Sequence, residues 1–513
     1  MTSDLRTEMN PVTEQIELAE PHLAGWLASL GLGVEYVRAA GNRLYYLDAD
    51  GTEVEVLDLV GGYGSTILGH NNPELVEYAK SLLDAGTPIH AQFSRHPYAN
   101  ELAWQVNAII RREFDTSEPY SAIFANSGAE SIEIALKHAE LDRVMRLAEV
   151  SAQIERNLVE IQASLGSAAD DLVAEVRAAN AERVLTAPVF LAPEGSFHGK
   201  LVGSVQLTHN PGYRTPFRAL AAQCRFVPQD DAEALTKIVA EERKTLLDLE
   251  VVDGAARIVE RDLPVIAAFV LEPIQGEAGI RELDRAFAAR VRAVADELGC
   301  PVVIDEVQSG MGRSGAFFAS SHLGLQGDYF TLAKSLGGGI AKAGLTLVRS
   351  SRYRTDFELV HSSTFAKDSF STLIASKTVE LLEAADGEAY RLAEHRGTQL
   401  RAMLEKLRGE FPAVIADVRG RGLMLGLEFA DLSGSPDDTI REQAESGLVG
   451  YLFSGYLLRA HAVRMFPTAS ATSTLRLEPS VYLDDADIAR LETALRGLIA
   501  VLQAHDGKTL LGI

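Results

Sequence analysis

The sequence predicts an α/β protein with a mainly parallel central sheet and a second, smaller α+β domain built from both terminal segments. Between residues 70 and 350, short β-rich apolar runs alternate with helical stretches, which is typical of a parallel sheet covered by helices on both faces. The 513 residues correspond to about three domain-sized units at ~150 residues each. With 47% hydrophobic residues, the chain has enough apolar side chains for a large core.

The first predicted element is an antiparallel hairpin over residues 34–60. Apolar and polar residues alternate there on both sides of Asp50-Gly51, a dipeptide that favours tight hairpin turns. Six β-rich runs follow, separated by helical stretches that include 128–138 and 285–298. The runs that we expect in the central sheet are 122–124, 189–192, 266–271, 301–304, 329–332 and 345–348.

A helical hairpin is predicted as an insertion at about residues 139–184. Apolar residues recur there at three- and four-residue steps, as on one face of an amphipathic helix, and 166–170 then breaks the pattern before a second helix. Two interpretations stay open: the hairpin is a stabilising addition, which we favour, or it is a lid or a dimer-contact element.

The chain after residue 350 is again helical at 369–385 and 388–408. The pattern then predicts β-structure at 414–429 and 474–478, and a final helix at 485–504. We therefore expect residues 1–65 and 350–513 to form the small domain and residues 66–349 to form the large domain.

Composition excludes several classes of partner and location. The formal net charge of −24 disfavours binding to nucleic acid or to an anionic membrane surface, because both would be repelled. The only cysteines, Cys224 and Cys300, cannot form a framework of several disulfides. The N-terminus lacks the basic and hydrophobic regions of a secretory signal, and the apolar run at 265–271 is far too short to span a bilayer. We expect a cytoplasmic protein.

Three short motifs carry candidate chemistry. Lys334 follows an apolar run and precedes three glycines, and lysine amines condense with aldehydes. Asp305 ends another apolar run, at the edge where open α/β sheets bind ligands. Ser127-Gly128 begins a helix whose free amides could bind a phosphate. Each motif alone has an ordinary structural explanation, as a surface lysine, a turn aspartate or a helix cap.

Only the combination is specific. Along the chain stand Ser127-Gly-Ala-Glu130, Phe197-His-Gly199, Glu272-Pro-Ile-Gln-Gly-Glu277, Asp305-Glu-Val-Gln308, Lys334 with its glycines, Thr364 and Arg476. In this set and order the sequence resembles the class III, ornithine or ω-type, aminotransferases of fold type I, which use pyridoxal 5′-phosphate (PLP). The resemblance covers roughly residues 34–500, apart from the helical insertion and extra chain around 231–262. It implies a seven-stranded central sheet.

The resemblance also implies roles for individual residues. Lys334 is similar to the lysine that binds PLP covalently and later moves a proton, and Asp305 to the acid that pairs with the pyridine nitrogen. The cofactor-binding set implied in this way is Ser127, Gly128, Ala129, Phe197, His198, Glu272, Asp305, Val307, Gln308, Lys334 and Thr364. Within it, Phe197 and Val307 enclose the ring, Gln308 reaches its hydroxyl, and residues 127–129 hold the phosphate. Thr364 matches a threonine that reaches the phosphate of the neighbouring subunit, which implies a homodimer.

Four residues are implied for the substrate. Arg476 resembles the arginine that clamps the α-carboxylate of glutamate, for which a planar guanidinium is well suited. Glu277 resembles a glutamate that pairs with this arginine when a substrate lacks that carboxylate. Tyr63 and Phe93 are expected to border the substrate. The sequence departs from the family pattern at Ala366-Lys-Asp-Ser369 and at Ile340-Ala341, near the expected dimer loop and substrate entrance.

The predicted activity is the transfer of an amino group from an amino-acid donor, for which we expect L-glutamate, to an aldehyde or keto acceptor in a ping-pong cycle. An aminomutase, racemase or decarboxylase on the same fold is the main alternative, because fold does not determine the reaction. A dinucleotide-dependent dehydrogenase is a remote alternative suggested by Gly310-x-Gly312-x-x-Gly315. A binding protein without activity is disfavoured by the intact Lys334 and Asp305. No H-E-x-x-H motif supports zinc hydrolysis.

Overall fold

A seven-stranded sheet lies at the centre of the computed structural model, which describes residues 19–91, 94–231 and 233–512. Its strands, in spatial order, are β4 (Tyr120–Ala125), β14 (Gly344–Arg349), β13 (Tyr329–Leu332), β12 (Val302–Asp305), β9 (Ile266–Leu271), β5 (Val189–Pro193) and β6 (Cys224–Val227). Neighbouring strands are parallel except at β14, which is antiparallel to both β13 and β4. The predicted mainly parallel sheet is confirmed, and β6 is the strand that sequence patterns missed.

Helices cover both faces of this sheet. On one face, α5 (Gly128–Leu165) packs Ile132 and Ala135 against a cluster that includes Val303 of β12. On the other, the residues that flank Val303 in β12 pack with α4 (Pro97–Phe114) and α9 (Arg285–Leu298). Because successive side chains point to opposite faces of a sheet, both faces of β9 and β12 are buried, and the two strands are apolar apart from Asp305 at the end of β12.

The carboxyl ends of three strands meet at one edge of the sheet. Asp305, the last residue of β12, lies beside Thr331 of the parallel strand β13. β4 runs in the same direction as β13, because each is antiparallel to β14. The segments that follow these strands, 126–128, 305–308 and 333–339, therefore meet at the edge where such sheets bind ligands.

Two further sheets come from the terminal segments. The first pairs β1 (Tyr36–Ala40), β2 (Arg43–Leu47), β3 (Glu53–Asp58) and β17 (Val463–Arg464), and the second pairs β15 (Ile415–Arg421), β16 (Met424–Phe429), β19 (Thr474–Leu477) and β18 (Phe466–Pro467). The hairpin predicted around Asp50-Gly51 is confirmed as β2 and β3. Strand β17 pairs in parallel with β3, which joins the C-terminal segment to the N-terminal one.

The helices of these segments agree with the sequence pattern. α11 (Ser369–Glu410) has non-helical backbone at Ala384–Gly387, close to the predicted division between two helices. α14 (Asp485–Gln503) begins with a capping box from Asp484. The other helices longer than one turn are α1 (Pro21–Ser29), α3 (Pro73–Asp84), α6 (Asp170–Arg183), α8 (Ala234–Glu242), α12 (Asp438–Glu445), α13 (Val449–His461) and α15 (Gly507–Leu511).

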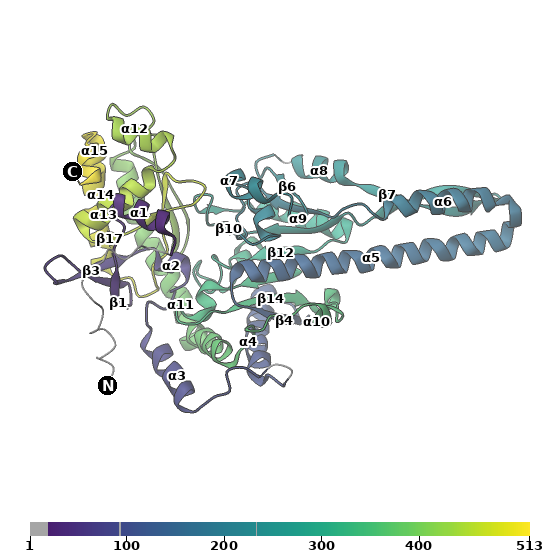
Figure 1. The fold of residues 1–513 in the computed structure, drawn as a ribbon, viewed down its shortest axis with the longest axis horizontal. Coiled ribbons are helices and arrows are strands. Elements are labelled where there is room, and N and C mark those ends of the chain that lie inside the picture. The colour runs from purple at the N-terminus through teal and green to yellow at the C-terminus, as the bar shows by residue number, and fades with distance from the viewer. Residues whose placement is uncertain (1–18, 92–93, 232, 513) are drawn as a thin grey trace.

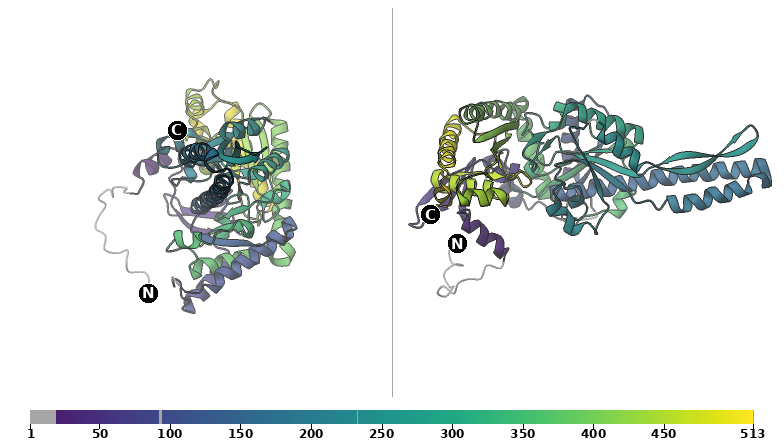
Figure 2. Two further views of the ribbon diagram at one scale, coloured as in Figure 1. Left: turned by 90° about the vertical axis from the view of Figure 1, so that its right-hand side faces the viewer. Right: turned by 90° about the horizontal axis from the view of Figure 1, so that it is seen from above.

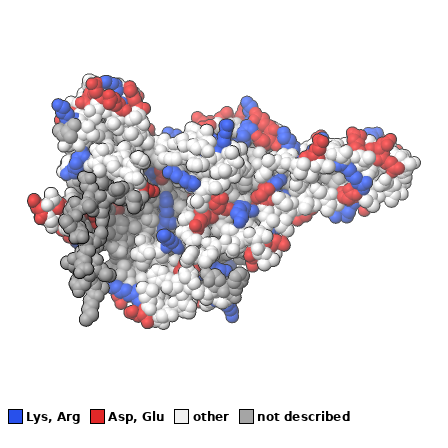
Figure 3. Space-filling view, in the orientation of Figure 1, with Lys and Arg blue, Asp and Glu red and all other residues white. Residues whose placement is uncertain are grey.

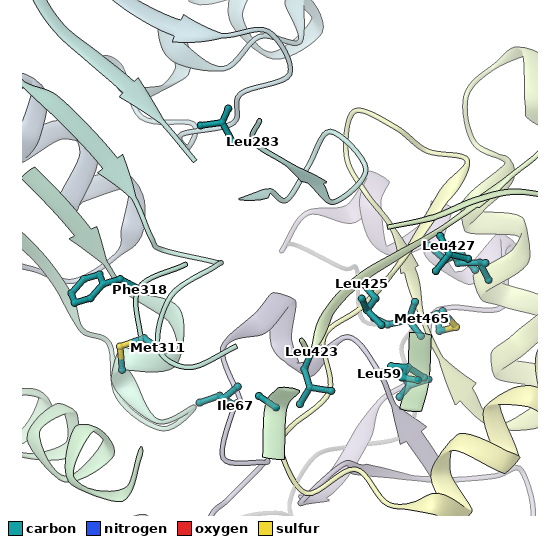
Figure 4. Packing of buried hydrophobic residues seen from close by; sticks show 14 of the residues in the cluster. Leu59, Ile67, Leu283, Met311, Phe318, Leu423, Leu425, Leu427 and Met465 are labelled. Carbon is teal, nitrogen blue, oxygen red and sulfur yellow. The ribbon is translucent and has the colours of Figure 1, made fainter. Parts of the chain in front are cut away.

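One hydrophobic cluster joins the terminal sheets to the central sheet. It includes Phe318 next to the central sheet, Ile67, and Leu425 and Leu427 of β16 (Figure 4). Because these buried side chains form one contiguous cluster, the loops between the two regions are held against a continuous apolar interior.

A long arm extends from the body of the molecule (Figure 1). It consists of the distal part of α5, the helix α6, and an antiparallel hairpin of β7 (Lys244–Val252) and β8 (Ala255–Leu263). These elements share an apolar core of their own that includes Leu158, Val173 and Leu246. Figure 2 shows the two helices lying alongside the β-hairpin.

The arm differs from the predicted insertion in two ways. α5 is a single helix of 38 residues that starts at Gly128, so no break marks the expected start of the insertion at about 139. The hairpin β7–β8 was not predicted, although its residues fall in the extra chain around 231–262. Acidic and basic side chains are interspersed over the visible face of the arm (Figure 3). Within the described residues, no helix is both long enough and apolar enough to cross a membrane.

Candidate active site

Lys334 stands two residues after the end of β13 (Tyr329–Leu332), at the ligand-binding edge of the sheet. Its backbone has a left-handed φ of 47°, which is uncommon for a residue with a Cβ. Gly338 allows close packing behind it, since a Cβ there would lie 2.5 Å from Leu75 Cδ1. Enclosure by the protein lowers the pKa of Lys334, although the negative charges of Glu478 and Glu277 oppose this effect. A lowered pKa increases the fraction of neutral, nucleophilic amine.

Asp305 is held by three hydrogen bonds at the end of β12. Its Oδ2 lies 2.8 Å from Nδ1 of His198, and its Oδ1 accepts from the Val307 amide at 3.0 Å and from the Thr331 hydroxyl at 3.3 Å. The aspartate is 6% exposed. Burial alone would lower the pKa of His198, but the hydrogen bond and charge of Asp305 raise it. His198 therefore acts as a buried support that orients the carboxylate.

Glu272 holds the loop that carries Phe197 and His198. Its Oε1 accepts from the Phe197 amide at 2.9 Å, and its Oε2 accepts from the Gly276 amide at 3.2 Å. Burial raises the pKa of Glu272 to about 7, and the charge of Asp305 adds to this while His198 opposes it. Glu272 thus fixes the backbone at Phe197 and at Gly276.

The start of α5 forms the candidate phosphate site. Ser127 is the N-cap, and its hydroxyl accepts from the Glu130 amide at 3.3 Å. The amides that begin the helix face outward from its positive end, as in many anion sites. Gly128 packs closely on the Asp305 loop, because a Cβ there would lie 2.5 Å from Val307 Cγ1. Ala129 follows in the first turn, so this cup lies next to the loop that carries Asp305.

Arg476 and Glu277 form a buried ion pair. Arg476, in β19, is 1% exposed, and its Nη2 donates to Glu277 Oε2. That carboxylate also accepts from the Ala469 amide at 2.8 Å. Although burial alone would raise it, the positive charge of Arg476 lowers the pKa of Glu277. Arg476 Nε and Nη1 have no hydrogen-bond partner among the described residues, so the guanidinium keeps donors for a further anion.

Tyr63 lies against the same guanidinium. Its ring centroid is 4.9 Å from Arg476 Cζ, a cation–π distance, and the side chain is 42% exposed. Residues 61–64 all have positive φ, which places Tyr63 in a left-handed turn between glycines. Gly61 lets this turn pack closely on the backbone after β19, since a Cβ there would lie 2.2 Å from the Glu478 carbonyl oxygen.

The remaining predicted residues are more dispersed. Gln308 donates to Glu478 Oε1 at 2.8 Å. Thr364 lies in an exposed loop between α10 (Phe357–Val360) and α11. Phe93 lies outside the described residues.

Glu478 is the residue that sequence reasoning missed. It is fully buried, and its Oε2 lies 3.6 Å from Arg476 Nη1. The signal was present, because Glu478 stands two positions after Arg476, and side chains two positions apart in extended chain point to the same face. A glutamate next to an apolar strand was nevertheless more easily read as an exposed residue.

These residues fit the cofactor that the resemblance implies. PLP needs an amine, a carboxylate and an anion site, and Lys334, Asp305 and the start of α5 provide them at one sheet edge. Phe197 and Val307 are partly exposed there. The absence of a Cβ at Gly128 lets the anion site approach the carboxylate loop closely.

Comparisons with known proteins identify the family of this chain. The family model of "Aminotransferase class-III" matches residues 29–475. The putrescine aminotransferase of Pectobacterium atrosepticum is 30% identical over 461 residues, which is 89% of this chain and 80% of that protein. Two solved structures share the fold: ornithine aminotransferase from Toxoplasma gondii ME49 (TM-score 0.66, 19% identity, 92% and 91% coverage) and a transaminase with L-alanine (TM-score 0.68, 19% identity, 92% and 99% coverage). This chain belongs to the class III aminotransferases and is a PLP-dependent transaminase.

Proposed function

We propose that the enzyme takes an amino group from L-glutamate and transfers it to an aldehyde or keto acceptor in a ping-pong cycle. The buried pair of Arg476 and Glu277 is the observation that carries this proposal. An arginine with free donors binds a carboxylate bidentately, and a glutamate beside it neutralises the charge when no carboxylate is bound. One site can then accept two substrates of different charge.

Each residue has a distinct task in the proposed cycle. When bound, PLP withdraws the electron pair that is released at the reacting carbon. Asp305, oriented by His198, keeps the proton on the pyridine nitrogen. The amine of Lys334, whose pKa is lowered by enclosure, removes and returns the proton at the reacting carbon. The amides at the start of α5 and the hydroxyl of Ser127 hold the phosphate, and Phe197 and Val307 enclose the ring.

The ion pair switches between two arrangements. A donor carboxylate displaces Glu277 from Arg476, whereas a substrate without a carboxylate leaves the pair closed. The relative from Pectobacterium is named for putrescine, a diamine without any carboxylate, which supports the closed arrangement as a productive state.

We further propose a cytoplasmic homodimer. Phe365, next to Thr364, is 62% exposed, and Leu359 and Trp104 are also large exposed apolar side chains. Such exposed apolar residues favour association with a second copy, and a dimer would bring Thr364 to the phosphate of the other subunit. Cys224 and Cys300 are buried free thiols, which supports a reducing compartment. The proposed domains remain residues 1–65 with 350–513, and residues 66–349.

The test is the visible and near-ultraviolet absorption spectrum of the purified enzyme before and after L-glutamate, with Lys334→Ala as the control. Conversion of the cofactor band to that of the pyridoxamine form would support glutamate as the donor. A band that glutamate leaves unchanged, but that another amine converts, would overturn the donor assignment. The Lys334→Ala protein should show no such conversion.

A further inference from the structure

A line of four aromatic side chains leads away from Arg476. We propose that this aromatic strip, formed by Tyr63, Phe466, Tyr451 and Trp26, binds the non-reacting part of the acceptor. The acceptor class is accordingly an aldehyde or ketone with an aryl group or a long alkyl chain. This inference rests on the proposed function, because it assumes that the acceptor reacts beside Arg476 and Lys334.

The rings of the aromatic strip form a connected series. From Arg476 Cζ the ring of Tyr63 is 4.9 Å away, and from Tyr63 the ring of Phe466 is 6.3 Å away. Phe466 lies 6.3 Å from Tyr451, and Tyr451 lies 4.9 Å from Trp26. Four separate segments supply these rings: the turn at 61–64, β18, α13 and α1. Tyr63 is exposed and Phe466, Tyr451 and Trp26 are half-buried, so each side chain keeps some surface that a ligand could reach.

The backbone and neighbouring charges hold the strip in place. Tyr63 is fixed in a left-handed turn that L residues rarely adopt, and such strain is often found at ligand sites. Arg464 Cζ lies 4.9 Å from the ring centroid of Phe466, and Arg464 Nη1 donates to Asp58 Oδ1 at 2.9 Å. Rigid aromatic surfaces of this kind bind apolar groups with little loss of side-chain entropy.

Charge at the inner end defines the orientation of the ligand. Burial raises the pKa of the Tyr451 phenol, while the positive charge of Arg476 opposes this shift and the negative charge of Glu277 adds to it, so the phenol stays neutral. Arg476 and Glu277 lie at the Tyr63 end of the series, which continues past Phe466, with Arg464 over its ring, through Tyr451 to the indole of Trp26. The reacting carbonyl belongs at the polar end and the apolar tail along the rings.

A purely structural role would be to pack α1 against α13, and kinetics distinguish the two. With L-glutamate as donor, we expect Trp26→Ala and Tyr451→Ala to raise the KM for nonanal about tenfold or more, because methylene contacts are lost. The KM for propanal should remain nearly unchanged, and Leu185→Ala, at an 80% exposed position just after α6 in the arm, should alter neither. An equal effect on both aldehydes, or no preference of the unmodified enzyme for nonanal, would overturn the proposal.

Ligand binding provides a second readout that does not need turnover. Trp26 and Trp104 are the only tryptophans, so holoenzyme carrying Trp104→Phe reports on Trp26 alone. Nonanoate and propanoate carry the same carboxylate for Arg476 and differ only in the tail. We expect nonanoate to give a saturable change in Trp26 fluorescence and propanoate to give none. If both fail to change it, or both change it equally, the strip does not bind the tail, whatever the outcome with glutamate as donor.

Discussion

Replacing Glu277 by glutamine tests the buried ion pair most directly. The substitution preserves shape and the ability to accept from Arg476 Nη2 and from the Ala469 amide. It removes the negative charge that compensates a guanidinium only 1% exposed. Because Glu478 remains 3.6 Å from Arg476 Nη1, some compensation persists.

The expected loss of stability follows from the burial. Breaking one partner of a buried pair costs about 3–5 kcal/mol, and the remaining Glu478 places this case near the lower end, at about 3 kcal/mol. The unfolding entropy is about 1.1 kcal/mol/K for 513 residues at ~2.1 cal/mol/K each, so the melting temperature should fall by about 3 °C.

Thermal unfolding of the holoenzyme measures this shift, and the same measurement with a carboxylate ligand gives a second comparison. Glutarate should raise the melting temperature of Glu277→Gln more than that of the unmodified enzyme, because it supplies the missing anion to Arg476. The matched control is Glu282→Gln, since Glu282 pairs with Arg421 at 3.0 Å on the surface and should cause almost no change. If Glu277→Gln and Glu282→Gln behave alike, the electrostatic role of the pair is refuted.

Three further predictions concern the cofactor site and pH. Lys334→Ala should lower kcat by at least about 100-fold, because general acid–base catalysis contributes that much, and an assay with added ethylamine should recover part of the rate. Asp305→Asn should weaken PLP binding and lower kcat together, since the amide cannot hold the pyridine proton by charge. The cofactor band after dialysis measures PLP binding, and retained activity would exclude the proposed role. Burial raises the pKa of Glu306 from 4.5 to about 7, so this carboxyl favours the folded state below about pH 4.5. That contribution, about 3 kcal/mol, is lost as pH rises through 7, and Glu306→Gln should flatten the fall in melting temperature between about pH 5 and 8. An unchanged slope would show that other groups dominate.

Much of the fold is encoded in local pattern. The β-rich runs at 266–271 and 329–332 are strands because continuous apolar stretches of that length are buried on both faces of a parallel sheet. β6 escaped detection because it has only four residues and includes Arg225. The hairpin β7–β8 escaped because its charged outer face breaks the apolar pattern, while its stability comes from packing on α5 and α6.

The sequence by itself determined the family and the chemical groups, because Lys334, Asp305 and Ser127 each stand at the end of a recognisable strand, where chain direction places ligand-binding residues. Only the tertiary structure decided which side chains meet. His198 contacts Asp305 across 107 positions of sequence, and Gln308 donates to Glu478 across 170. The aromatic strip joins four segments in the same way. Long-range contacts of this kind depend on how separate elements pack, and no local pattern of residues carries that information.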